Sequence, residues 1–185
     1  MVIKFPLLIF ALFFPGSSLA EVFEQELYST VWRVFSHPNS LNSVTNEAST
    51  LNYSVSELGW VSMVAKDLVV RDLTHIDAIS LKVVVHAPSN ATLRVTFSDL
   101  DSQTRQQEMH WLDFKALLSE SGGKRMTMPM SELKLSYGTG ARHNDQIWDP
   151  ANLASLELNF VGTGKTARGS VSIETISFHE RDESN

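Results

Sequence analysis

Four residues with hydrogen-bonding side chains, His86, Arg94, Glu157 and Asn159, occupy outward positions in short alternating runs. Each has apolar neighbours on both sides in the chain, which is typical of the solvent-exposed face of a β-strand. Imidazole, guanidinium, carboxylate and amide groups can together hydrogen-bond the hydroxyl groups of a ligand. We therefore predict that these residues line a polar groove. Two alternatives stay open: these are ordinary solvated positions, or Arg94 and Glu157 form a cross-strand ion pair.

Aromatic side chains are the second component of such a site, because a flat ring can cover the apolar face of a ligand. The candidates near predicted loops, with one histidine among them, are Trp111, Tyr137, His143 and Trp148. Trp148 has an alternative role as the anchor of a helical turn. Trp60 and Tyr53 are assigned to the core instead, because they are in phase with apolar neighbours.

Enzymatic motifs are few in this chain. It has no Cys, no Gly-x-Ser-x-Gly elbow and no phosphate-binding loop. Asp99 and Asp101 stand two apart at a predicted strand end, where paired carboxylates could hydrolyse a glycoside. An Asp-rich turn is the ordinary interpretation of this pair. His110 near Arg105 could serve a lyase, yet no second acid–base partner accompanies it, and the His residues lack zinc-ligand spacing.

The elements that would position these residues are short alternating runs, typical of antiparallel strands. Residues 154–161 and 169–178 are predicted to form a long hairpin, with a β-bulge at Glu174 and Thr175, where the alternation slips by one residue. A second predicted hairpin joins residues 79–85 to residues 93–97.

Further along the chain, residues 105–111 are a predicted return strand. Met126, Met128 and Met130 alternate, and thioethers in this arrangement more often fill a core than bind a metal. Asp149 and Pro150 fit the cap and first position of a helical turn. Eight or nine strands with very little helix and no internal repeat predict an all-β fold, a two-sheet antiparallel β-sandwich.

Length and composition are those of one globular domain: 185 residues, 43% hydrophobic and 19% charged. The formal net charge is -6, without a basic cluster. Such a chain is a poor partner for nucleic acid, because phosphate neutralisation needs grouped Lys and Arg.

Residues 1–20 have the features of a secretory signal peptide. Lys4 provides the positive start, residues 7–14 the apolar centre, and Ala20 ends a small-x-small cleavage site. The alternative, a retained membrane anchor, needs an apolar run of roughly 20 residues. We expect no transmembrane segment in the mature chain. Export without any Cys, and so without disulfides, favours a bacterial periplasmic or extracellular protein.

The order of these runs resembles the jelly-roll carbohydrate-binding modules of the galactose-binding-like fold. The resemblance covers roughly residues 47–179. It is carried by residues 51–55 followed by 60–61, and by residues 72–79, 93–99, 125–133 and 170–178. We divide the chain accordingly into a signal peptide at 1–20, a lead-in and edge strand at 21–46, a sandwich domain at 47–180 and a polar tail at 181–185.

The resemblance implies an exported protein that binds a poly- or oligosaccharide without cleaving it. It also implies, as the one candidate cofactor, a structural Ca²⁺ near the chain ends, for which Glu47 and Glu174 stand at plausible positions by analogy. Two alternatives remain. One is an envelope or matrix protein whose sandwich binds a protein partner, and the other is a small glycan-active enzyme.

Overall fold

The computed structural model describes residues 19–26, 32–36, 43–47, 50–65, 72–100, 107–135 and 147–181. Most of the predicted signal peptide and the residues after Arg181 lie outside this part of the chain. Within the described residues, no helix has the length and apolar character needed to cross a bilayer.

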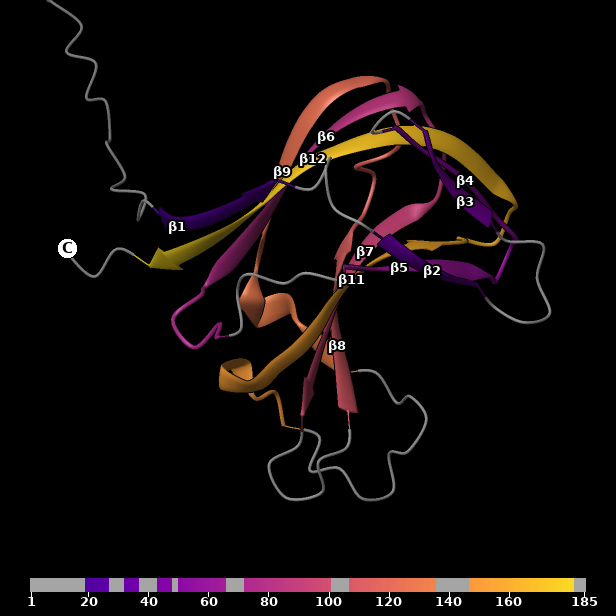
Figure 1. Cartoon of the computed structure of the whole chain (residues 1–185). Helices are drawn as coiled ribbons and strands as arrows, with labels where there is room; N and C mark the ends of the chain where they lie inside the picture. Colours follow the sequence, from indigo (N-terminus) through magenta and orange to yellow (C-terminus); the bar gives the residue numbers. More distant parts are fainter. Residues whose placement is uncertain are drawn as a thin grey trace, which may run out of the picture.

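The strands form two six-stranded antiparallel sheets, one above the other in Figure 1. Sheet A consists of β1 (Leu19–Glu26), β3 (Ser43–Glu47), β4 (Thr50–Val55), β6 (Ala78–Ala87), β9 (Gly122–Pro129) and β12 (Ala167–Arg181). Sheet B consists of β2 (Trp32–Ser36), β5 (Trp60–Ala65), β7 (Thr92–Leu100), β8 (Gln107–Phe114), β10 (Lys134–Leu135) and β11 (Leu153–Val161). Two short 3-10 turns, η1 (Met130–Glu132) and η2 (Pro150–Asn152), complete the described elements. The predicted all-β sandwich is confirmed.

The strand order is β3-β4-β12-β6-β9 in sheet A and β10-β8-β7-β11-β5-β2 in sheet B. β12 is 15 residues long. It carries β6 on one edge, and first β4 and then β1 on the other. Its pairing with β6 shifts between Ile173 and Thr175, so Glu174 is the extra residue of a bulge. The predicted slip at this position is confirmed.

Both predicted hairpins are wrong in their pairing. β11 pairs with β5 and β7 in sheet B, whereas β12 pairs only within sheet A. β6 and β7 are likewise in different sheets, and the return strand β8 is the one that pairs with β7. Alternation shows which side chains face the core. It does not show whether two consecutive strands pair in one sheet or lie in opposite sheets, because their side chains face the same core in both cases.

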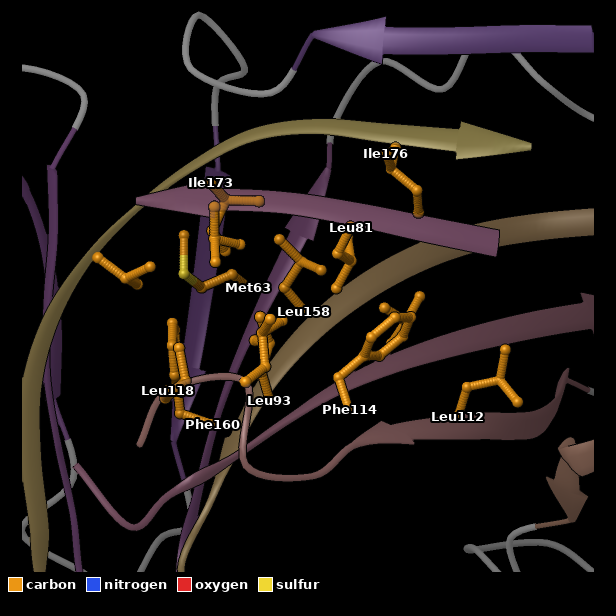
Figure 2. Packing of buried hydrophobic residues seen from close by; sticks show 14 of the residues in the cluster. Met63, Leu81, Leu93, Leu112, Phe114, Leu118, Leu158, Phe160, Ile173 and Ile176 are labelled. Atoms are coloured by element: carbon orange, nitrogen blue, oxygen red, sulfur yellow. The ribbon is translucent and has the colours of Figure 1, made fainter. Parts of the chain in front are cut away.

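The core lies between the inner faces of the sheets, where side chains from both layers interdigitate (Figure 2). Tyr53 of β4 stacks on Phe160 of β11 across the sandwich, with ring centroids 4.2 Å apart and planes at 11°. Tyr53 is 3% exposed, as its apolar phase predicted. Gly169 leaves room for the phenol, because a Cβ there would lie 2.1 Å from the Tyr53 hydroxyl oxygen.

Two smaller predictions also agree with the structure. The methionines of the 126–130 run are partly buried against the core, while Thr127 and Pro129 between them are exposed. The Asp149 side chain accepts a hydrogen bond from the Ala151 N–H at the start of η2, and Pro150 is its first residue. This cap sets the entry into β11, which carries two of the candidate site residues.

Candidate functional site

The outer face of sheet B is built from residues that alternate with core residues on β5, β11, β7 and β8. Antiparallel register aligns them in rows across the sheet. One row consists of Ser62, Asn159, Arg94 and Asp113, and the next of Val64, Glu157, Thr96 and Trp111. Three predicted ligand-binding residues from strands distant in sequence therefore become neighbours of Trp111.

A pocket of about 180 Å³ opens on this face, and we call it the outer pocket. Its lining combines two indole rings with charged, amide, hydroxyl and apolar groups. The lining residues are Trp60, Arg94, Thr96, Met109, Trp111, Glu157, Asn159 and Val161. Aromatic surface next to a few polar groups is the usual composition of a small-ligand site.

Arg94 is held on two sides within the outer pocket. Its guanidinium carbon lies 4.5 Å from the centre of the Trp111 ring. Its Nε and Nη2 donate to the two carboxylate oxygens of Asp113, at 2.7 and 3.3 Å. Lys134 is also within 3.5 Å of that carboxylate. The alternative of an ion pair between Arg94 and Glu157 is not realised, because Asp113, directly opposite on β8, pairs with the guanidinium instead.

Opposing effects act on the pKa of Asp113. Burial raises the pKa, but the hydrogen bond and positive charge of Arg94, together with Lys134, outweigh burial and hold the pKa below the usual 3.8. The carboxylate is therefore ionised at neutral pH and anchors Arg94 in a bidentate pair.

Glu157 and Asn159 are held by diagonal hydrogen bonds between strands. The Ser62 hydroxyl donates to Glu157 Oε2 at 2.6 Å, and Asn159 Nδ2 donates to the Thr96 hydroxyl at 2.8 Å. These contacts fix the side chains, and a carboxylate or amide has more hydrogen-bonding positions than one such bond uses. Both residues can therefore still bind a ligand.

Trp60 is the aromatic residue of the pocket that the sequence reasoning missed, and the other missed lining residues are Thr96, Met109 and Val161. Trp60 was assigned to the core, but it is 36% exposed and lies on the outer face, opposite Val161. The neighbouring Val61 and Met63 are the residues that point inward. Ser62 stands two positions after Trp60 and so faces the same side of the sheet. Its polar side chain was the sequence signal that the Trp60 ring points outward.

The remaining predicted ligand residues lie elsewhere. His86 is on sheet A, with its Nε2 2.9 Å from the Ser172 hydroxyl. Trp148 packs against the core beside Phe97 and His110, so the alternative role as an anchor describes it better. Tyr137 and His143 lie outside the described residues.

Of the two predicted calcium residues, the structure describes the side chain of Glu174 alone. The Glu174 carboxylate pairs with Lys82 at 2.9 Å. Glu47 ends β3, and its side chain is outside the description. The calcium site stays a prediction.

A different set of ligand-type residues lies on the inner face of sheet B. Asp99, Glu108 and His110 are all buried there, so the Asp99 side chain is not part of an exposed turn. Burial lowers the pKa of His110, and the nearby charge of Glu108 partly opposes this effect. Asp101 and Arg105, which the sequence analysis considered beside Asp99 and His110, lie outside the described part of the chain.

The fold is the jelly-roll sandwich of carbohydrate-binding modules. A family 11 carbohydrate-binding module from Clostridium thermocellum, in complex with a β-1,3-1,4-mixed-linked tetrasaccharide, is similar with a TM-score of 0.62 and 16% identity, over 83% of this chain and 94% of that chain. The family 11 module of a cellulosomal cellulase from the same organism gives a TM-score of 0.62 and 13% identity, over 92% and 99%. At these identities the likeness is one of fold. No protein-family model matches the sequence, and no curated protein matches it either.

Proposed function

We propose that this protein is an exported, non-catalytic binding protein that recognises a poly- or oligosaccharide at the outer pocket. One observation carries the proposal: Trp60, Trp111, Arg94, Glu157 and Asn159 converge on a single pocket of the outer sheet face. A sugar ring needs an aromatic surface for its apolar face and fixed polar groups for its hydroxyls.

The two indoles have different roles in this proposal. The guanidinium of Arg94 covers one face of Trp111, so that face is not open to a sugar ring. Trp60 stands at the other end of the pocket and is the more exposed platform. A pyranose stacked on Trp60 would place its hydroxyls toward Asn159 and Glu157. The pocket volume of about 180 Å³ suits a small part of a glycan chain, so a longer ligand would continue along the sheet.

Binding without cleavage is supported by the acids near the pocket. Glu157 is the one carboxylate in the described lining, and it accepts a hydrogen bond from Ser62. Asp113 is engaged by Arg94. Glycoside hydrolysis by the usual route needs two carboxyl groups on either side of the scissile bond.

Export is the second part of the proposal. The leader-like residues 1–20 and the absence of Cys support a bacterial periplasmic or extracellular location. Polysaccharides outside the cytoplasm would be accessible to such a protein.

The experiment is a screen of the purified protein against a glycan array and against insoluble polysaccharides, with and without a chelator. Mixed-linked β-1,3-1,4 oligosaccharides are the first class to test, since a module of the same fold was solved with such a ligand. Specific retention of any glycan supports the proposal. Release of sugar fragments would point to a glycan-active enzyme, and no retention across the panel would favour a protein partner.

A further inference from the structure

Two acids and one histidine converge on the inner face of sheet B, close to where β7 ends and β8 begins. Glu108 of β8 pairs opposite Asp99 of β7, and His110 follows two residues later on the same face. Their exposed fractions are 4%, 1% and 3%. One ligand-type atom from each lies within 4.8 Å of the others.

The imidazole of His110 points into this group without a hydrogen bond from its inner nitrogen. Nε2 lies 3.6 Å from Asp99 Oδ2 and 3.8 Å from Glu108 Oε2. Both distances exceed those of ordinary hydrogen bonds. In the described part of the chain, this buried nitrogen has no hydrogen-bond partner. A buried polar atom in that state needs an explanation, such as an unseen ion.

The spacing of the three atoms matches ligands around one metal ion. Zn²⁺ binds imidazole nitrogen and carboxylate oxygen at about 2.0–2.2 Å in tetrahedral geometry, so two ligand atoms lie roughly 3.4 Å apart. The observed separations of 3.6 and 3.8 Å are close to this value. A dication would also offset the desolvation and mutual repulsion of two buried carboxylates.

We propose that Asp99, Glu108 and His110 form a structural site for a divalent transition-metal ion, with Zn²⁺ as the first candidate. The mixed nitrogen and oxygen donors favour such an ion over Ca²⁺ or Mg²⁺, which take oxygen ligands. The site is structural because its ligands are shielded from solvent, with the Trp148 ring 5.0 Å from that of His110.

The surroundings of the site support the ligand geometry. The backbone N–H of Asp149 donates to Asp99 Oδ2 at 2.6 Å, the kind of outer hydrogen bond that orients a ligating carboxylate. The segment that bears Asp149 leads into η2, and the Pro150 carbonyl accepts from the Leu73 N–H at 2.7 Å. A bound ion would therefore join the ends of β7 and β8 to the segment that covers them.

This inference does not depend on carbohydrate binding, because the readouts are metal stoichiometry and stability. The test uses untagged protein, stripped with a chelator and dialysed, and titrated separately with Zn²⁺, Co²⁺ and Ca²⁺. We expect one equivalent of Zn²⁺ by calorimetry and visible absorption bands from bound Co²⁺. Saturating Zn²⁺ should raise the Tm by roughly 5–10 °C.

Two variants locate the ion. His110→Gln and Glu108→Gln keep side-chain size and should each weaken Zn²⁺ binding about 10- to 100-fold or more. His179→Gln is the matched control, because His179 is also buried but bonds to Ser80 at 2.8 Å in the other sheet. Stripped wild-type protein that is folded by circular dichroism and takes up neither Zn²⁺ nor Co²⁺ would overturn the proposal. Undiminished Zn²⁺ binding by both folded variants, or binding of Ca²⁺ alone, would overturn it equally.

Discussion

Arg94 and Trp111 form a cation–π pair on the outer face of sheet B, with the guanidinium carbon 4.5 Å from the ring centre. They sit diagonally on adjacent strands, and Asp113 holds the other side of the guanidinium. Each partner thus restricts the rotamers of the other before any ligand arrives. Because these side chains are already ordered, less side-chain conformational entropy is lost when a ligand binds.

Trp60→Ala is expected to weaken glycan binding more than any other single change in the outer pocket. Loss of a stacking platform costs about 2 kcal/mol or more, which is roughly 30-fold in affinity. The partly exposed ring contributes little to the core, so the Tm should change by only a few degrees. Affinity electrophoresis with the best glycan from the screen measures the change. His86→Ala, on sheet A, is the control, and an equal loss in that variant would contradict the placement of the site.

Arg94→Lys tests whether the guanidinium fork matters beyond its charge. Lysine cannot form the bidentate pair with Asp113 or stack in the same way on Trp111. We expect the free energy of unfolding to fall by about 1–2 kcal/mol and glycan affinity to fall as well.

The exposed ion pair of Lys82 with Glu174 supplies the comparison for this change. Lys82→Ala should lower stability by no more than about 1 kcal/mol, because Lys82 is largely solvated. Urea unfolding of both variants decides the question. Equal losses would mean that the Arg94 network is no stronger than a surface pair.

The Asp113 pair predicts a pH dependence of stability. Its pKa is lower in the folded chain than the usual 3.8, so the folded state binds fewer protons. The stabilising contribution is fully present above the unfolded pKa of about 3.9 and is lost as pH falls through the folded value. Asp113→Asn should therefore show a smaller fall in unfolding free energy between about pH 6 and pH 3 than the wild type. Parallel curves for the two proteins would disprove the assignment.

Gly169→Ala should disturb the stack between the sheets. The new Cβ would lie 2.1 Å from the Tyr53 hydroxyl oxygen, so the ring must shift away from Phe160 and from its 2.7 Å hydrogen bond with Ser89. Overpacking of this kind costs about 1–3 kcal/mol. Gly123→Ala is the matched control, because a Cβ there meets nothing within 4 Å. Chemical denaturation should show a clear loss only at Gly169.

The fold class could be predicted because alternation is a local property of the chain. Runs such as that around Leu156, Leu158 and Phe160 show directly which side chains are buried. Strand pairing could not be obtained in this way. The short segment 162–166 could close a hairpin or cross the sandwich, and it crosses, since β11 and β12 lie in different sheets. That choice depends on packing between layers, which leaves no local signal.

The candidate site was predictable to the same extent. The alternation of apolar and polar residues identified Arg94, Glu157 and Asn159 as outward-facing. The pairing of β11 with β7 makes them neighbours. His86 has the same local signature, but its strand belongs to the other sheet. The buried group around His110 was hidden for a related reason. Its residues are not spaced as a metal motif along the chain, and only the pairing of β7 with β8 brings them together.

The pairing of β1 with the end of β12 has a practical consequence for engineering. Glu21 is paired with His179, so the two ends of the described chain meet at one end of sheet A (Figure 1). A short linker could close the polypeptide into a ring, and new termini opened in the exposed turn at 163–166 would then give a circular permutant. The outer pocket belongs to sheet B instead. Immobilising the protein on a bead or a sensor surface through a linker attached at either end of the described chain would therefore leave its proposed glycan-binding face clear of the support.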